Sequence, residues 1–488
     1  MIQTLIPLPA SAQARCKGRF GRILGTTLTA RALLLLLAGL LCAIPGFFGL
    51  HWLVLMLGWD ALVLLLVLTD ILSLPPAHSL RVTRSFVDSP VLGRETRIEL
   101  AVEHATNAVL QVHITDDLHP ALAQLPPSGA LSVFPREPAR LPFTITPNRR
   151  GDFTLGPLWL RWTGRLRLAQ RRALAEPAQK IRVYPTMERS ADDTALYLLR
   201  IRQIELQRRR LRLTGAGREF DHLRDYRAGD ELRNISWPAT ARRAKVVTRE
   251  FTTERSQQVW IVLDAGRLSG TVFELRRSAP LRQAASATFR DAASDESFLL
   301  SLTQLDQACS AGIALAQTVM QAGDKAGLLV YGRAIQQQLL PATGSGALRV
   351  VIDSLSQARV EGSEADHLRA AARLGQLQRR RSLVLWITEM ADSARRPDIA
   401  DAAVDLARRH LVLLLVLNHP EIQTTAAREP RTPVQMFESA AAQEVLERRR
   451  QILAGLRSKG VLVAETNPGA LRTDAINEYL EVKARGLL

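Results

Sequence analysis

A single acidic residue stands where α/β proteins commonly bind ligands. Asp264 closes the apolar run VWIVLD and precedes AGRLSG. The carboxyl ends of parallel strands form the ligand-binding edge of an open sheet, and an Asp followed by two hydroxyl residues in the pattern DxSxS supplies the oxygen ligands that Mg²⁺ prefers. In this chain Gly266 and Leu268 occupy the hydroxyl positions, and Ser269 comes one position late. Asp264 is therefore expected to cap the following turn, with a degenerate magnesium site as the alternative.

The rest of the chain offers no recognisable catalytic set. It contains no GxxxxGK[ST] phosphate loop, no HExxH and no GxSxG, and its three cysteines form no CxxC pair. Glu389 and Thr343 follow other apolar runs and could add oxygens to Asp264, but scattered oxygens do not make an octahedral site. We expect a protein that is not an enzyme and needs no cofactor, with Mg²⁺ as the one metal considered.

One acidic residue, Asp60, lies inside a long apolar run. A carboxylate in a bilayer is costly and usually faces a partner helix or water. A pair of helices cannot enclose an ion path, so we interpret Asp60 as a contact between helices or between copies of the chain.

The most unusual polar stretch covers residues 215–251 and alternates Arg with Asp and Glu around several aromatic residues. Guanidinium groups pair with carboxylates in a two-pronged geometry, so we expect an ordered loop rich in ion pairs, neither a clean helix nor a strand. An internal network is the favoured interpretation, and a docking surface is the alternative. The residues singled out in this signature are Arg218, Glu219, Phe220, Arg224, Tyr226, Gly229, Asp230, Arg233, Trp237, Thr240 and Arg242.

Residues 31–74 predict a transmembrane hairpin. The run is long enough for two helices of about 20 residues each, and PGFFGLHW interrupts it with a proline and glycines. Phe47, Phe48 and Trp52 are of the type found at the bilayer interface. Arginines precede the first helix and follow the second, so both ends are expected to face the cytoplasm, and a cleaved signal peptide is the rejected alternative.

The elements on either side of this run differ in their periodicity. Residues 1–30 form a basic N-terminal segment, and residues 78–185 alternate apolar and polar positions between Pro and Gly breaks, as in a small β-sandwich. Residues 186–256 link this part to a C-terminal domain at 257–488. The strands expected before the link are RIELAVEH, VLQVHITDDL, LPFTITPN and DFTLGPLWLRW, with a turn at 148–151.

The C-terminal domain alternates continuous apolar runs with helical ones, which indicates a doubly wound parallel sheet covered on both faces. The runs expected as strands are QVWIVLD, AGLLVYG, RSLVLWIT, HLVLLLVLN and GVLVAET. Residues 270–301 are polar and weakly periodic, so we expect an insertion or flexible loop there.

The chain is strongly basic, with a formal charge of +17. Three interpretations are open: nucleic-acid binding, attraction to the anionic cytoplasmic leaflet, or a genome that favours Arg. The Arg runs at 207–213, 378–381 and 447–450 are interpreted as solvated helix faces. Charge alone does not choose between these interpretations.

The signature GREFDHLRDYRAGDELRNISWPATARRAKVVTREF resembles that of the uncharacterised bacterial family known as domain of unknown function number fifty-eight. The pieces TPNRRGDFTLGPLWL, IRVYP, the twin apolar helices and GDKAGLLVYG support the resemblance. It implies a membrane-anchored protein with a β-domain and a Rossmann-like von Willebrand A-type domain, associated with MoxR-type AAA+ ATPases. AGRLSG and WTGRLRLAQRR depart from the family pattern, where a serine-bearing metal loop and a DPFGL-like turn are expected.

We therefore expect an inner-membrane scaffold or adaptor whose soluble domains face the cytoplasm. It would present the von Willebrand A-like domain to a protein partner, a MoxR-type ATPase, in complex maturation or envelope-related processes. Membrane lipid is the second expected partner, and homo-oligomerisation is considered. A basic-surface protein that binds nucleic acid or anionic lipid is one alternative, and a magnesium-dependent ligand-binding module is another.

Overall fold

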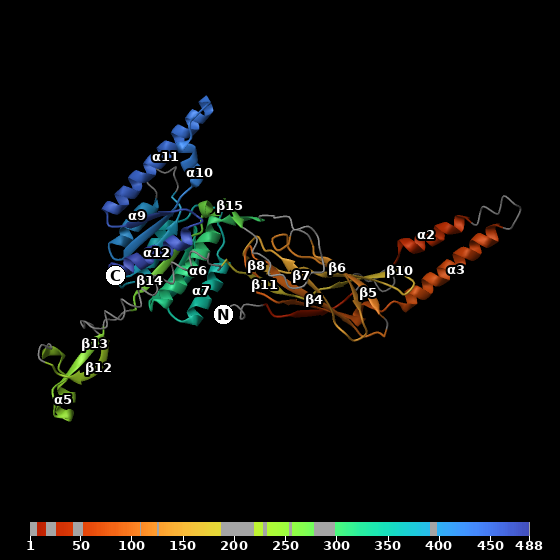
Figure 1. The fold of residues 1–488 in the computed structure, drawn as a ribbon, viewed down its shortest axis with the longest axis horizontal. Helices are drawn as coiled ribbons and strands as arrows, with labels where there is room; N and C mark the ends of the chain where they lie inside the picture. The colour runs from red at the N-terminus through yellow and green to blue at the C-terminus, as the bar shows by residue number, and fades with distance from the viewer. Residues whose placement is uncertain are drawn as a thin grey trace. The chain divides into compact units, whose positions relative to one another are not determined.

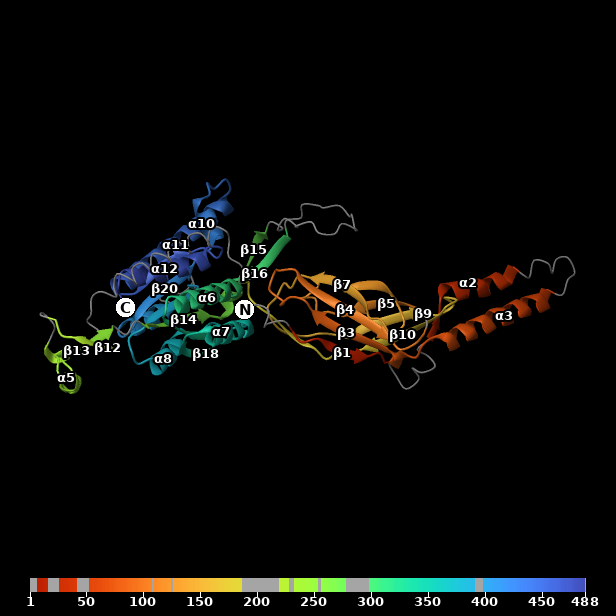
Figure 2. The same ribbon diagram turned by 60° about the horizontal axis from the view of Figure 1, so that its bottom comes forward.

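The computed structural model describes residues 7–15, 26–41, 52–107, 109–123, 126–186, 219–227, 232–252, 256–277, 298–390 and 398–487. The chain divides into two compact units, residues 1–186 and 187–488. Each unit has its own sheets, shown in Figures 1 and 2.

The first unit is built from antiparallel sheets, as the alternating pattern of residues 78–185 predicts. One sheet has the strand order β1-β3-β4-β7, the second β2-β10-β9-β5-β6, and a small third sheet pairs β11 with β8. The strands are β1 (Ala10–Gln13), β2 (Thr26–Leu28), β3 (Leu80–Phe86), β4 (Thr96–His104), β5 (Leu110–Asp116), β6 (Ser128–Val133), β7 (Ala139–Ile145), β8 (Gly151–Thr154), β9 (Leu158–Thr163), β10 (Ala169–Ala175) and β11 (Lys180–Val183).

The two larger sheets share one hydrophobic core. Side chains that alternate along β3 and β4, such as Val82 and Leu100, pack in the same cluster as Val112 and Trp162 from the second sheet. This burial follows from the period of two, because every second residue of a strand faces the same side.

The N-terminal segment is part of these sheets. β1 pairs antiparallel with β3, and β2 pairs antiparallel with β10. Residues that precede the apolar run therefore share sheets with residues that follow it.

Two apolar helices lie between β2 and β3. They are α2 (Ala30–Ala38) and α3 (Trp52–Ser73), followed by the short 3-10 helix η3 (Ala77–Ser79). Within the described residues α3 is the one helix long and apolar enough to cross a membrane, while the first apolar helix, Ala30–Leu41, is shorter. Phe47 and Phe48 lie outside the described residues.

The two helices pack against each other. Trp59 Nε1 of α3 donates to the carbonyl oxygen of Leu35 of α2 at 2.8 Å. A Cβ added at Gly39 would lie 2.8 Å from Oδ1 of Asp60, so glycine permits this close approach. The Oδ1 atom of Asp60 is buried and has no hydrogen-bond partner among the described residues.

Both helices are attached to one turn of the β unit, the β9–β10 turn, residues 164–168. Asp70, in the last turn of α3, accepts backbone N–H bonds from Leu166, Leu168 and Ala169, each at 2.9 Å. Thr29, the cap of α2, donates its hydroxyl to the carbonyl of Arg167 at 2.7 Å. The WTGRLRLAQRR segment therefore provides the seat for both helix ends.

The second unit contains a six-stranded sheet in the order β18-β17-β14-β19-β20-β21. Every neighbouring pair is parallel except β17 with β18. Five of the strands coincide with the apolar runs expected from the sequence. The strands are β14 (Gln258–Asp264), β17 (Lys325–Tyr331), β18 (Ile335–Ala342), β19 (Leu383–Thr388), β20 (Leu411–Leu417) and β21 (Leu462–Thr466).

Helices cover both faces of this sheet. Side chains of α8, α9 and α11 form one core with Trp260, Val384 and Leu414, whereas Gly312 of α6 faces Ile261 and Leu263 on the opposite side. Figure 1 shows α9 and α11 on one side and α6 and α7 on the other. The helices are α6 (Gln304–Gln321), α7 (Ser345–Gln357), α8 (His367–Leu377), α9 (Asp398–Ala407), α10 (Pro420–Ala427), α11 (Pro433–Ser458) and α12 (Leu471–Ala484).

Two stretches expected as loops contain regular structure, so those expectations are wrong in part. The signature holds β12 (Glu219–Asp225), η4 (Leu232–Asn234), α5 (Trp237–Arg243) and β13 (Val247–Thr252), with β12 antiparallel to β13. The supposed insertion begins with η5 (Arg267–Gly270) and β15 (Val272–Arg277) and ends with β16 (Phe298–Thr303), which pairs with β15. Pairing between strands satisfies the backbone N–H and C=O groups of these polar segments. The periodicity of the side chains alone does not reveal this pairing.

Candidate functional site at the carboxyl edge of the parallel sheet

Asp264 caps the turn that follows β14. Its Oδ1 accepts the backbone N–H of Gly266 at 2.8 Å, and its Oδ2 accepts the hydroxyl of Thr388 at 2.7 Å. The side chain is buried. This geometry matches the expectation that Asp264 caps the turn, and it places Thr388, at the end of the neighbouring β19, beside the carboxylate.

The oxygens around Asp264 do not fit the needs of Mg²⁺. Both of its carboxylate oxygens already accept hydrogen bonds, and Ser269 donates to the carbonyl of Gly266 at 2.7 Å. Thr343 follows Ala342, which pairs with Ala326 at the start of β17, so it lies at the opposite edge of the sheet. Among the described residues, no group of three or more His, Cys, Asp or Glu side chains is placed to hold a metal ion.

An aromatic network occupies the space next to Asp264. Trp386 Nε1 donates to the hydroxyl oxygen of Tyr331 at 2.7 Å, and that oxygen lies 2.8 Å from Nδ1 of His367. The rings of Tyr331 and Trp386 meet edge to face with centroids 5.9 Å apart. The Tyr331 oxygen is therefore hydrogen-bonded to both Trp386 and His367.

Burial controls the protonation of this network. Burial raises the pKa of Asp264, an effect opposed by the nearby His367 and by the bonds from Gly266 and Thr388. Burial lowers the pKa of His367, against the attraction of Asp264. Burial and the charge of Asp264 together raise the pKa of the Tyr331 phenol. A neutral imidazole beside a neutral phenol is the arrangement that these shifts favour.

The chain itself covers the carboxyl ends of β14 and β17. Backbone bonds join Glu361 N–H to the carbonyl of Ala265, and Arg267 N–H to that of Ser363. Asp366 N–H bonds to the carbonyl of Gly332. Residues 359–366 therefore lie where an open α/β sheet would otherwise receive a ligand.

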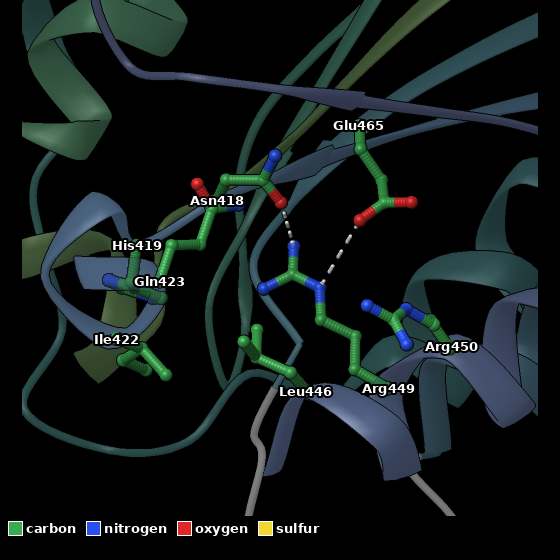
Figure 3. A pocket seen from close by; sticks show the side chains of 8 residues that line it. All are labelled: Asn418, His419, Ile422, Gln423, Leu446, Arg449, Arg450 and Glu465. Carbon is green, nitrogen blue, oxygen red and sulfur yellow. Dashed lines mark hydrogen bonds and ion pairs between the residues drawn. The ribbon is translucent and has the colours of Figure 1, made fainter. Parts of the chain in front are cut away.

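A crevice lies at the same edge between β20 and β21 (Figure 3). It has a volume of about 230 Å³, and α10 and α11 contribute to its walls. The residues that line it are Asn418, His419, Ile422, Gln423, Leu446, Arg449, Arg450 and Glu465.

Arg449 is the central side chain of this crevice, which Figure 3 shows between Asn418 and Glu465. It donates to the carbonyl of Leu417 at 2.7 Å and to Oδ1 of Asn418 at 2.8 Å, and its Nε lies 3.9 Å from Glu465. The side chain is only 5% exposed. The expectation that the 447–450 run is solvated is therefore wrong for Arg449, because its guanidinium ties α11 to the end of β20.

The crevice wall continues into a second buried carboxylate. His419 Nε2 is hydrogen-bonded to Glu389, the residue after β19. Charged groups of both signs thus face one small volume without a nucleophile held by a base. Such an arrangement of charged side chains can bind a polar group.

The residues of the signature are dispersed over the β12–β13 hairpin. Tyr226 directly follows β12, Trp237 starts α5 with an exposed side chain, and Arg224 donates to the carbonyl of Asp225 at 3.2 Å. The Thr240 hydroxyl accepts the N–H of Val247 at 3.1 Å, and Arg242 is exposed in α5. Arg218, Gly229 and Asp230 lie outside the described residues, as do the side chains of Glu219, Phe220, Arg233 and Trp52.

Three structural residues were missed by the sequence reasoning. Arg84 and Asp116 form an ion pair between the two larger sheets, with both side chains fully buried. The sequence signal that could have identified this pair is its position in the strands. Each of the two residues stands where the alternating pattern of its strand places a buried, otherwise apolar side chain. Asp70 is the third, and its signal is an acidic residue at the end of an apolar helix just before PP.

The comparisons with known proteins place part of this unit in a family. Residues 222–289 and 275–426 match the family model described as "Protein of unknown function DUF58". No curated protein matches the chain.

Several solved structures are similar to roughly half of the chain. The conserved hypothetical protein BatB from Bacteroides thetaiotaomicron aligns at 14% identity and a TM-score of 0.27, covering 47% of this chain and 100% of that one. An aerotolerance-related membrane protein from Bacteroides fragilis NCTC 9343, with multiple mutations to serines, aligns at 12% identity and a TM-score of 0.25, covering 46% and 99%. Proximal thread matrix protein 1 from the mussel byssus aligns at 9% identity and 0.25, covering 46% of each chain.

The family match covers the signature hairpin and the sheet through β20, and it agrees with the resemblance found in the sequence. Residues 222–426 of the chain thus match the DUF58 family.

Proposed function

We propose that the protein is a membrane-anchored scaffold that presents a von Willebrand A-like α/β domain to a protein partner, a MoxR-type AAA+ ATPase. The anchor is a helical hairpin in the inner membrane, and both units face the cytoplasm. The protein is not an enzyme in this proposal.

The observation that carries the anchor is the path of the chain around α3. Strands β1 and β2 precede the apolar helices, β3 follows them, and all three belong to the two larger sheets of the first unit. A chain that crosses a bilayer through α3 must therefore cross back before it. Residues 30–51 are long enough for that second crossing, since about 20 residues span the hydrocarbon core.

The proposal that this domain is presented to a protein partner is supported by the chain segment that covers the carboxyl edge of its sheet. Residues 359–366 cover the ends of β14 and β17, and Asp264 is engaged by Gly266 and Thr388. A domain whose usual ligand position is closed by its own chain is better suited to contact through its outer surface. No observation favours the magnesium-dependent alternative.

An apolar patch at the start of α11 is the surface proposed for the partner. Val434, Met436 and Phe437 are 66%, 60% and 78% exposed. Val434 and Phe437 are three residues apart and therefore share a face of α11, and exposed apolar surface of this kind commonly marks protein contacts. The MoxR-type partner itself comes from the family resemblance.

Two measurements test the proposal separately. Alkaline carbonate washing of membranes tests the anchor, and we expect the full chain to stay in the pellet. Affinity purification in mild detergent with nucleotide present tests the partner, and we expect an AAA+ ATPase to copurify. The double substitution Met436→Ser/Phe437→Ser should abolish copurification, whereas Leu340→Ser, which alters an exposed residue of β18, should not.

The outcomes separate anchor from partner. Release of the chain by carbonate would exclude the anchor. Absence of an ATPase from the wild-type purification, with the chain still in the membrane, would exclude the partner and leave the anchor standing.

A further inference from the structure

The β9–β10 turn combines exposed apolar and basic side chains at the ends of both apolar helices. Leu166 is 50% exposed, and both of its neighbours, Arg165 and Arg167, are exposed as well. Leu28, which pairs with Ala169 beside the turn, is 39% exposed.

The hydrogen bonds that attach the two helices to this turn fix its depth relative to the membrane. The N–H of Leu166 bonds to Asp70 in the last turn of α3, and the carbonyl of Arg167 accepts from Thr29 at the start of α2. From Trp52 to Thr69, α3 rises about 27 Å, close to the thickness of a hydrocarbon core. A turn bonded to the ends of both helices lies in the adjoining headgroup layer.

A shallow cavity beside the turn adds a third basic group. Its volume is about 420 Å³, and it is lined by Thr29, Ala30, Arg31, Gln111, Thr163 and Arg167. Arg31 is exposed, as Arg167 is. Long basic side chains at this level keep their stems along apolar surface and place their charge among lipid phosphates.

We propose that the β9–β10 turn is a membrane-contact loop, with Leu166 inserted among lipid chains and Arg165, Arg167 and Arg31 bound to the phosphates of anionic phospholipids. This inference rests on the proposed membrane anchor and deepens it. The β unit is then held rigidly on the bilayer surface, because its turn contacts lipid and both helices at once.

Depth measurement tests the contact directly. In a full-length chain with Cys16, Cys42 and Cys309 changed to Ser, Leu166→Cys is labelled with a bimane fluorophore and reconstituted into phosphatidylglycerol vesicles. Ser128→Cys is the matched control, because it lies exposed on β6 opposite Thr115, near the far end of β9 and about 16 Å from the turn. We expect lipids brominated near the headgroup to quench the label at 166, and aqueous iodide to quench the label at 128.

A charge test follows from the same geometry. Arg165→Gln/Arg167→Gln should lower the ratio of phosphatidylglycerol to phosphatidylcholine that copurifies with the protein, by up to about 5-fold per Arg. Arg182→Gln on β11 should leave the ratio unchanged. Equal iodide quenching at positions 166 and 128, with no bromine quenching, would overturn the contact while carbonate-resistant anchoring stands. Release by carbonate would overturn the anchor and the contact together.

Discussion

At the scale of single residues, the buried pair of Arg84 and Asp116 makes stability depend on pH. Burial raises the pKa of Asp116 to about 6, and Arg84 opposes that change. Below pH of about 3 the Asp is mostly protonated in both the folded and unfolded states. As the pH rises toward 6 the unfolded state releases its proton first, so the free energy of unfolding falls.

We therefore predict that wild type loses about 3 kcal/mol relative to Asp116→Asn between pH 3 and pH 7, because a tenfold change in an ionisation equilibrium corresponds to about 1.4 kcal/mol. Chemical unfolding of the full chain in detergent at several pH values measures this difference. Asp152→Asn, which removes the more exposed pair with Arg182, is the control for the loss of a carboxylate that pairs with an Arg. A gap between wild type and Asp116→Asn that stays constant with pH would contradict the prediction.

The network beside Asp264 gives a second prediction for single residues. Tyr331→Phe removes the oxygen that accepts from Trp386, and a buried N–H left without a partner costs about 1–3 kcal/mol. The double variant Tyr331→Phe/Trp386→Phe removes donor and acceptor together. We expect its free energy of unfolding to fall by less than the sum of the two single losses, as a double-mutant cycle measures. Strict additivity would show that the bond contributes nothing.

At the scale of elements, the junction between α3 and the β9–β10 turn is tightly fitted. A Cβ at Gly164 would lie 2.2 Å from Oδ1 of Asp70. We predict that Asp70→Ala lowers the free energy of unfolding by about 3 kcal/mol, because two buried N–H groups and one partly buried N–H group lose their acceptor. Gly164→Ala should destabilise wild type similarly, since the new methyl displaces the carboxylate.

The combination of these substitutions makes the junction testable. In the Asp70→Ala background, Gly164→Ala should cost little more, because the clashing carboxylate is gone. Thermal unfolding of the four proteins in one detergent measures this, and Gly455→Ala, at an exposed position of α11 with no atom within 4 Å of the added Cβ, is a control. Equal losses from Gly164→Ala in both backgrounds would rule out the fitted junction.

Elements of strong periodicity could be predicted from the sequence, and elements that depend on pairing could not. β14, β19 and β20 are continuous apolar runs, and such runs indicate strands of a sheet that is buried on both faces. β18 is an edge strand of glutamines and half-exposed residues, and β12 is charged, so only their backbone partners define them. For the site, the position of Asp264 could be predicted, whereas His367 and Arg449 come from distant helices whose contacts no local pattern encodes.

At the scale of the whole molecule, the strands decide how the chain meets a membrane. β2 ends one residue before the cap of α2, and β3 begins soon after α3. Because both strands are in the same unit, the helices leave it and return to it on one side. An odd number of crossings would separate strands that are hydrogen-bonded in one sheet.

We therefore predict that both ends of the protein face the cytoplasm. Green fluorescent protein fused after residue 488 should fluoresce in bacterial cells, and alkaline phosphatase fused there should be inactive, since the first folds in the cytoplasm and the second only outside it. The same pattern is expected for fusions before residue 1. Phosphatase inserted between α2 and α3 should be active, because a hairpin that leaves the cytoplasm and returns to it exposes its tip on the other side of the membrane. Active phosphatase at both ends would overturn the cytoplasmic orientation while leaving the hairpin in place, and activity at the C-terminus alone would show a further crossing after the first unit.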